Sequence, residues 1–104
     1  LLFPFNFCAA AQIHNAFSES IISSIELISN LFKKAKLVHG DFSEYNIFKT
    51  KNGLKLFDLG SAVDTTHPNT MNFLKRDINN ITNFFVKRGL TVENPTDILE
   101  RITK

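Results

Sequence analysis

Apolar residues recur along residues 17–35 at the three- and four-residue spacing of an amphipathic helix. Ser18 or Ser20 is a candidate cap for the start of this helix, and lysines gather at its end, where positive charge suits the helix dipole. The predicted apolar face consists of Phe17, Ile21, Ile25, Ile28, Phe32 and Ala35. The helix leads directly into a polar segment that begins at His39.

A short β-hairpin is predicted around this polar segment. Apolar pairs at 37–38 and 47–48 flank the segment as short strands, and Asn52-Gly53 is a typical hairpin turn. The apolar positions of 54–57 then form a strand that returns the chain to Asp58.

The chemistry-bearing residues are expected to converge in this hairpin. Because a hairpin brings the start of one strand beside the end of the next, Asn46 and Asp58 should lie side by side, with Asp41 in the loop just before. Clustered carboxylates repel unless a cation lies between them, and Mg²⁺ prefers oxygen ligands. The order and spacing are those of a phosphoryl-transfer site, in which the first Asp orients the attacking hydroxyl and the other two residues hold Mg²⁺.

The remaining pattern is mainly helical. The chain is expected to stay irregular through Pro68, and a second helix should begin at about Thr70 and stop before Gly89. Its apolar face is predicted at Leu74, Ile78, Ile81 and Phe85. Asp77 lies beside that face and is expected to be a buried, hydrogen-bonded anchor, because burial without partners would be costly. A short last helix is predicted to start at 94–96.

The segment between Asp58 and the second helix is short. Only residues 59–69 separate Asp58 from Thr70, and no Ala-Pro-Glu sequence occurs. Ordinary protein kinases place a long activation segment ending in Ala-Pro-Glu at this point. The spacing therefore favours small-molecule or self-directed phosphoryl transfer, or an ATPase cycle, over broad peptide phosphorylation.

Three strings resemble the RIO family of atypical protein kinases and are most similar to its RIO kinase 1 branch. They are HGDFSEYN at 39–46, FDLGSAVD at 57–64 and HPNTMNFLKRDINNITNFFVKRGL at 67–90. The resemblance covers most of the chain. It implies an α+β fold, namely the carboxy-terminal lobe of a protein-kinase-like domain, mainly helical with a small β-hairpin at the active site. Residues 1–16 would be a strand and hinge from the amino-terminal lobe, and residues 17–104 would form the lobe itself.

The resemblance also assigns roles to individual residues. It implies that Asp41 is the catalytic Asp and that Asn46 and Asp58 are metal ligands. Asp58 would also carry a transient phosphoryl group as an acyl phosphate. Asp77 would fix the catalytic loop from beneath. Independently of the resemblance, Ser43 is a candidate for placing the nucleotide side of the loop.

The neighbouring residues are less distinctive. His39 is expected to be structural and to pack under the loop, Glu44 could cap or form a salt bridge, and Tyr45 could pack. Ser61 is a departure, because the family usually has Gln there, and this places the fine geometry of the segment in question.

The implied function is ATP- and Mg²⁺-dependent serine/threonine kinase or ATPase activity in the maturation of the small ribosomal subunit. The expected partners are ATP and the pre-ribosomal small subunit in the cytoplasm, with no membrane and no sequence-specific nucleic-acid binding. Two alternatives stay open. One is a small-molecule phosphotransferase of the aminoglycoside or choline kinase type, which shares the HGD…N…D pattern. The other is a non-catalytic kinase-like binding module.

Composition adds limits to this interpretation. The 104 residues suit one domain or part of one, and a net charge of +2 does not demand a nucleic-acid partner. The single cysteine, Cys8, fits a reducing compartment. The apolar start lacks the positive charge of a signal peptide and is too short to span a membrane.

The nucleotide-binding parts of an amino-terminal lobe are missing from the sequence. None of the four glycines forms a glycine-rich loop, and no strand Lys with a partner helix Glu can be identified. Because the chain also opens on Leu1 rather than Met, it is expected to be a fragment that binds nucleotide weakly and is inactive alone.

Overall fold

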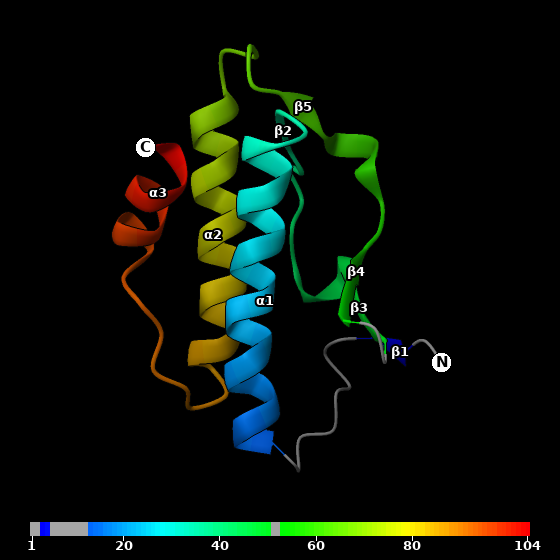
Figure 1. The fold of residues 1–104 in the computed structure, drawn as a ribbon, viewed down its shortest axis with the longest axis vertical. Helices are drawn as coiled ribbons and strands as arrows, with labels where there is room; N and C mark the ends of the chain where they lie inside the picture. Colours follow the sequence, from blue (N-terminus) through cyan, green and yellow to red (C-terminus); the bar gives the residue numbers. More distant parts are fainter. Residues whose placement is uncertain (1–2, 5–12, 51–52) are drawn as a thin grey trace.

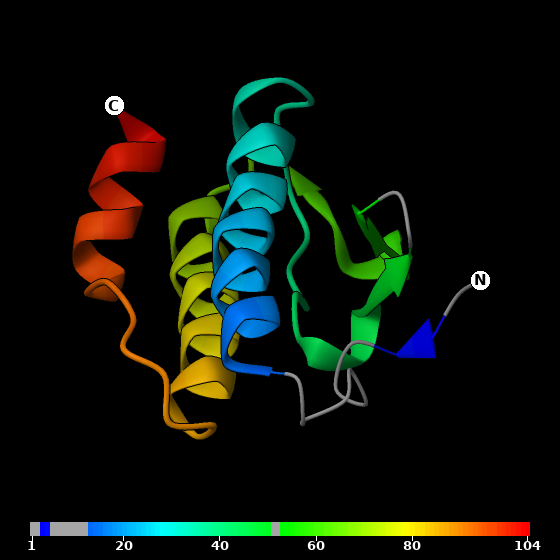
Figure 2. The same cartoon turned by 60° about the horizontal axis from the view of Figure 1, so that its bottom comes forward.

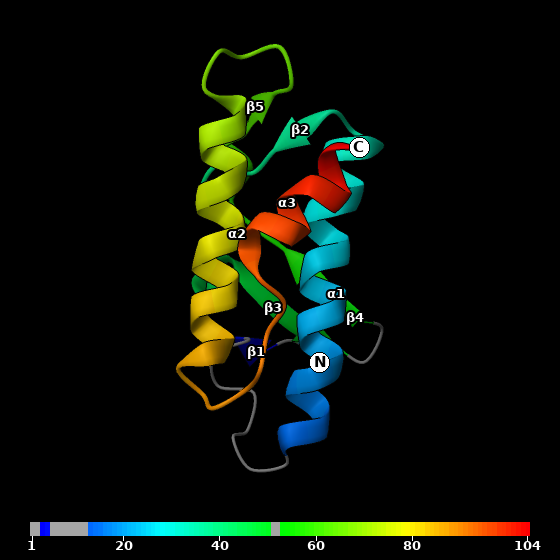
Figure 3. The same ribbon diagram turned by 90° about the vertical axis from the view of Figure 1, so that its left-hand side faces the viewer.

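Two long antiparallel helices form the centre of the molecule. The computed structural model describes residues 3–4, 13–50 and 53–104. In it, α1 (Ile13–Lys33) and α2 (Thr70–Val86) lie side by side (Figure 1), and α3 (Pro95–Thr103) packs against both of them (Figure 3). The short strands lie on the side of this helical layer that faces away from α3 (Figure 2). The expected α+β, mainly helical architecture is confirmed.

The described strands form two small antiparallel sheets. One sheet has the order β1-β3-β4, and the other pairs β2 with β5. The strands are β1 (Phe3–Pro4), β2 (Leu37–Val38), β3 (Ile47–Thr50), β4 (Gly53–Leu56) and β5 (Val63–Asp64). In the β3–β4 hairpin, Ile47 is opposite Leu56. The predicted hairpin is therefore confirmed, although β4 ends at Leu56, and Asn52 lies outside the described residues.

The core lies between the faces that the sequence predicts. All four predicted positions of α2 are buried, and Ile98 and Ile102 bury the inner face of α3. On α1, Ile28 is buried, and the partly buried side chains packed against the core include Ile21, Ile25 and Phe32. Burial of these amphipathic faces, rather than helix propensity, accounts for most of the stability of such helices.

Both predictions for the ends of α1 need correction. The helix begins at Ile13, so Ser18 and Ser20 lie inside it, and Ser20 is buried rather than a cap. A serine costs little inside a helix, and packing of the face outweighs its preference for a cap. Ala35 is exposed and lies beyond the helix, because the chain turns away into a left-handed conformation at Lys36.

The segment after Asp58 is more ordered than the sequence predicts. Within the stretch expected to be irregular, β5 pairs with β2, with Val63 opposite Val38. A strand of two residues is too short to show alternation in the sequence, so the pairing became visible only in the structure. It ties this segment to the strand that leads into the loop of Asp41.

The predicted helix boundaries near the carboxyl end are confirmed. Gly89 has a φ of 85° and its N–H donates to the Val86 carbonyl, while Leu90 N–H donates to Phe85. This is the glycine-terminated arrangement that satisfies the last carbonyls of a helix. The Asn94 side chain caps α3 by accepting from Thr96 N–H at 2.8 Å.

The amino-terminal predictions are only partly covered by the described residues. Phe3 and Pro4 pair with β3 as an antiparallel strand. The rest of the predicted hinge and Cys8 lie outside the described residues, and the boundary between residues 16 and 17 stays a prediction. Within the described ranges, no helix has the length and apolar character needed to cross a bilayer.

Candidate active site

Asp77 anchors the loop that follows β2. Its side chain is 1% exposed, and its two oxygens accept hydrogen bonds from Gly40 N–H at 2.9 Å and Phe42 N–H at 3.1 Å. Burial raises the pKa of Asp77, and the two N–H donors, His39 and Arg76 all act in the opposite direction. The predicted buried anchor is therefore present, because each carboxylate oxygen has a backbone partner.

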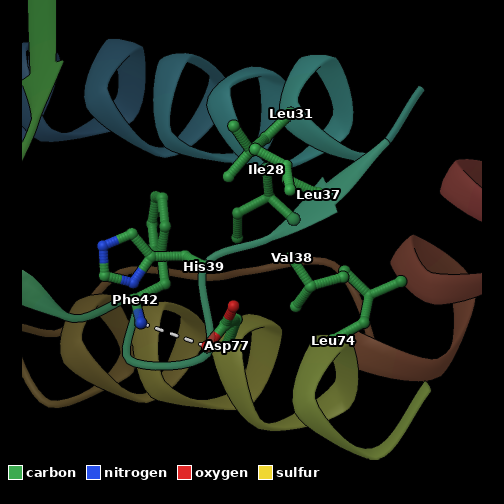
Figure 4. A pocket seen from close by; sticks show the side chains of 8 residues that line it. All are labelled: Ile28, Leu31, Leu37, Val38, His39, Phe42, Leu74 and Asp77. Atoms are coloured by element: carbon green, nitrogen blue, oxygen red, sulfur yellow. Dashed lines mark hydrogen bonds between the residues drawn. The ribbon is translucent and has the colours of Figure 1, made fainter. Parts of the chain in front are cut away.

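The space around Asp77 is a packed floor and not a ligand pocket. Figure 4 shows apolar side chains of α1, β2 and α2 closing over the carboxylate, with the hydrogen bond to Phe42 drawn. The lining residues are Ile28, Leu31, Leu37, Val38, His39, Phe42, Leu74 and Asp77, and they leave no room for a water molecule. The loop above is thus supported by close-packed core.

His39 links the two halves of the site. It is 1% exposed, its Nδ1 lies 3.1 Å from Asp41 N, and its Nε2 lies 2.9 Å from the Phe57 carbonyl oxygen. Because a backbone N–H can only donate, Nδ1 is the acceptor and Nε2 carries the proton that is donated to Phe57. Both ring nitrogens are occupied, so His39 has the structural role that was predicted.

Asn46 is held directly against Asp41. The Asn46 side-chain N–H₂ donates to the Asp41 carbonyl at 2.8 Å and to its carboxylate at 3.3 Å. A short 3-10 turn, Glu44–Asn46, delivers Asn46 to this position, and the Ser43 hydroxyl caps the turn by accepting from Tyr45 N–H. The Asp41 side chain remains exposed to solvent. The nucleotide-placing role of Ser43 stays a prediction.

Asp58 lies just after β4, between that strand and the 3-10 turn Leu59–Ser61. Phe57 N–H donates to the Asn46 carbonyl at 2.8 Å, which places Asp58 next to Asn46, as the hairpin argument predicted. The Phe57 ring also meets the Phe48 ring edge-on, with centroids 4.7 Å apart. Asp58 has φ 60° and ψ 70°, an uncommon left-handed conformation, and its carboxylate accepts from Gly60 N–H. Strained residues of this kind concentrate at functional sites.

The donor set of the site mixes carboxylates with an amide. Among the described residues no group of three or more His, Cys, Asp or Glu side chains is close enough to hold a metal ion. Since the Asn46 nitrogen is committed to Asp41, its amide oxygen is the atom available to a cation, together with the exposed carboxylate of Asp58. Few protein oxygens suit Mg²⁺, which keeps several waters and takes other ligands from phosphate.

Gly40 can only be glycine in this loop. It has a φ of 85°, and a Cβ there would lie 2.6 Å from the Ser61 carbonyl oxygen. The segment after Asp58 therefore touches the catalytic loop through its backbone, at the residue where the sequence departs from the family pattern.

Two features of the site were not predicted from the sequence. The Arg76 guanidinium donates to the Gly40 carbonyl oxygen, and it lies 4.9 Å from the centroid of the Phe73 ring. A basic residue directly before a buried anchor Asp is the only sequence signal for this contact. Tyr45, for which packing was considered, is 71% exposed instead.

Comparison with known proteins identifies the family. The family model described as the RIO domain matches residues 7–98. The chain belongs to the RIO domain family. A probable serine/threonine-protein kinase RIO1 homolog of Encephalitozoon cuniculi is 38% identical over 79 residues, which are 76% of this chain and 20% of that protein. The RIO-type serine/threonine-protein kinase Rio1 of Haloferax volcanii is 50% identical over 56 residues, or 54% of this chain and 19% of that protein.

A solved RIO structure has the same fold. The Rio2 kinase–ADP/Mg²⁺–phosphoaspartate complex from Chaetomium thermophilum superposes with a TM-score of 0.63 at 23% identity, covering 94% of this chain and 32% of that chain. The expected RIO resemblance and kinase-like fold are confirmed. This RIO domain chain spans about a fifth of the length of the two relatives above. The roles of Asp41, Ser43, Asn46 and Asp58 stay predictions.

Proposed function

We propose that this RIO domain takes part in ATP- and Mg²⁺-dependent phosphoryl transfer, as a serine/threonine kinase or ATPase. The observation that carries the proposal is the double attachment of Asn46. Its side chain holds Asp41, and its backbone carbonyl accepts from Phe57, the residue before Asp58. The exposed residues Asp41 and Asp58 are thus linked through Asn46, one by its side chain and the other by its backbone.

Each of the three residues has a chemical task in this proposal. Asp41 accepts the proton of the attacking hydroxyl or orients it, and Asn46 and Asp58 hold Mg²⁺ against the nucleotide phosphates. The ion neutralises charge on the phosphates when it is bound. His39 has no acid–base role, because both of its nitrogens are occupied by the backbone of the site.

Replacing Asp41 tests the catalytic role. In the full-length protein, Asp41→Asn is expected to lower the ATP turnover rate by about a hundredfold, the scale of a lost general base, while the affinity for ATP changes little. Asp97→Asn removes an equally exposed carboxylate on α3 and serves as the matched control. Turnover of Asp41→Asn equal to that of the control would remove Asp41 from the mechanism.

We also propose that Asp58 carries the phosphoryl group transiently. One carboxylate oxygen attacks the γ-phosphorus of ATP, a new O–P bond forms, the bond from that phosphorus to the β–γ bridging oxygen breaks, and ADP leaves. Water then attacks the phosphorus of the acyl phosphate, the O–P bond to Asp58 breaks, and inorganic phosphate leaves as the carboxylate is regenerated. The exposure of Asp58 supports this step, as does the phosphoaspartate named in the Chaetomium Rio2 complex.

Hydroxylamine distinguishes this intermediate from other phosphorylated species. After incubation with labelled ATP, the full-length protein should carry label that hydroxylamine removes, since hydroxylamine cleaves acyl phosphates and spares phosphoserine. Tryptic mapping should place the modified residue at Asp58. Label that survives the treatment completely would count against an aspartyl phosphate.

A specific observation favours self-directed transfer or an ATPase cycle over broad peptide phosphorylation. The segment after Asp58 is short, and β5 holds it against β2 instead of leaving it free as a docking platform.

By family resemblance, we propose that the protein acts in the cytoplasm on the pre-ribosomal small subunit. Co-sedimentation of the full-length protein with small-subunit precursors tests this, and sedimentation only as free protein would contradict it.

A further inference from the structure

The backbone around Asp41 is held at nearly every polar group. Asp77 accepts the N–H groups of Gly40 and Phe42, and His39 accepts the N–H of Asp41. Asn46 donates to the Asp41 carbonyl. These bonds fix the amides on both sides of the catalytic residue.

Arg76 donates a hydrogen bond to the Gly40 carbonyl, which Asp77, His39 and Asn46 do not bind. The Gly40 carbonyl belongs to the same peptide group as Asp41 N–H, and it accepts from the Arg76 guanidinium. This peptide group is therefore held at both ends, by His39 through the N–H and by Arg76 through the carbonyl. A rotation of the peptide plane would break both bonds at once.

Because residue 40 is glycine, the Gly40–Asp41 peptide group needs hydrogen bonds from other segments to keep one conformation. The clash of a Cβ with the Ser61 carbonyl oxygen at 2.6 Å and the φ of 85° require glycine. Glycine is also the residue whose backbone rotates most freely, so the peptide group that leads into Asp41 has little stiffness of its own. The conformation of Asp41 thus depends on the partners of its peptide groups.

The Arg76 side chain is itself positioned by neighbouring rings. Its guanidinium lies over Phe73, one turn earlier on α2, and the Phe73 ring lies 5.7 Å from the His67 ring. His67 in turn accepts from Asn69 N–H at the start of α2. The stack limits the rotamers of Arg76, which reduces the entropy lost when the guanidinium binds the carbonyl.

We propose that Arg76 is a positioning residue for catalysis, which locks the Gly40–Asp41 peptide group so that the Asp41 carboxylate stays directed at the attacking hydroxyl. The inference rests on the proposed function of Asp41. In this inference, Arg76 affects the rate of the chemical step through the Gly40–Asp41 peptide group and not by contacting nucleotide or metal.

The chain contains a matched control for this residue. Arg88 lies in the turn that follows the same helix, places its guanidinium 3.7 Å from the centroid of the Phe84 ring, and donates to the Phe84 carbonyl. It lies beyond the carboxyl end of α2, whereas the loop of Asp41 contacts Asp77 near the middle of that helix. Arg76→Met and Arg88→Met therefore remove the same kind of cation–π contact and carbonyl hydrogen bond, and only the first touches the site.

The test compares steady-state ATP turnover of the full-length protein and its variants. Arg76→Met should lower kcat by about tenfold and leave the KM for ATP within about twofold, the pattern of a contact that acts in the transition state. Arg76→Lys should recover part of the rate, because an ammonium still donates but lacks the planar group that stacks on Phe73. Arg88→Met should keep the parent kcat.

Hydrogen exchange provides a second readout that a loss of general stability would not imitate. The Asp41 amide should exchange faster in Arg76→Met than in Arg88→Met, when the two are compared at equal global stability. A kcat and an Asp41 exchange rate in Arg76→Met equal to those of Arg88→Met would overturn the inference.

The Asp41→Asn variant separates this inference from the proposed function. If Asp41→Asn keeps the parent kcat, the proposed function fails, and the inference that rests on it falls too. If Asp41→Asn loses activity while Arg76→Met keeps it, only the role of Arg76 is overturned.

Discussion

At the scale of single residues, Asp77 is subject to opposing effects. Its burial disfavours the carboxylate form, whereas the N–H donors of Gly40 and Phe42 stabilise that form, and the net effect is a raised pKa. Neutralising the group would remove part of the desolvation cost but would weaken the bonds that hold the loop. The loop geometry is thus maintained at a cost in stability when the carboxylate is ionised.

The raised pKa of Asp77 gives a pH dependence of known sign. Between the ordinary value of 3.8 and the raised value, the folded protein binds more protons than the unfolded chain. The contribution of Asp77 to the free energy of unfolding is therefore largest below 3.8 and is lost as pH rises through the raised pKa. Asp77→Asn lacks this dependence.

Urea unfolding of the parent and of Asp77→Asn over a series of pH values measures the effect. The free energy of unfolding of the parent minus that of Asp77→Asn should fall as pH rises from about 3 toward neutrality, because other titrating groups cancel in the difference. A difference that rises with pH would mean that the N–H bonds outweigh burial and that the pKa of Asp77 is lowered.

At the scale of elements, two glycines with the same backbone conformation have different neighbours. Gly40, in the catalytic loop, and Gly89, after α2, both have a φ of 85°. A Cβ at Gly40 would meet the Ser61 carbonyl oxygen. Within the described part of the chain, a Cβ at Gly89 would have no heavy atom within 4 Å apart from those of adjacent residues. Comparing the two positions separates the free-energy cost of the left-handed backbone conformation from the free-energy cost of a close contact.

Substitution of each glycine by alanine should therefore give unequal results. Gly89→Ala should lower the free energy of unfolding by about 1 kcal/mol, the cost of a left-handed residue, and leave ATP turnover unchanged. Gly40→Ala should cost about 1–3 kcal/mol more, because the loop and β5 segment must move apart, and turnover should be lost. Chemical denaturation and turnover assays check this, and equal stability losses would show that the Ser61 contact relaxes freely.

The sequence predicted most of the elements for identifiable reasons. The face of α2, its stop at Gly89 and the start of the last helix at 94–96 were predictable because periodicity and terminal residues are local signals. The start of α1 was not, because Ser20 has the chemistry of a cap but the position of a core residue. The two-residue strand β5 was missed because its pairing with β2 is a long-range contact.

At the scale of the whole molecule, the site gathers segments that are far apart in the sequence. The convergence of Asp41, Asn46 and Asp58 was predictable, since one hairpin joins them. The anchor Asp77 was predictable from its place beside an apolar face. The bridge through His39 and the contact of Arg76 were not, because both end on backbone carbonyls, which no side-chain pattern reveals.

The described residues form only part of the proposed nucleotide site. Close-packed core supports the loop of Asp41, while Asp41 and Asp58 are exposed to solvent. The chain spans about a fifth of the length of the two named relatives. Nucleotide binding should therefore be measured on the full-length protein. The expectation of weak binding by this segment alone stays a prediction.

Asn46 and Asp58 are proposed to hold Mg²⁺ against ATP, and the decisive measurement is calorimetric titration of the full-length protein with ATP, with and without Mg²⁺. In the parent, Mg²⁺ should tighten ATP binding. Asn46→Ala and Asp58→Asn should each lose most of that gain, at least about tenfold in Kd or 1.4 kcal/mol, with metal-free binding unchanged. Asp97→Asn should keep the full gain. Retention of the full Mg²⁺ dependence by Asp58→Asn would contradict the account.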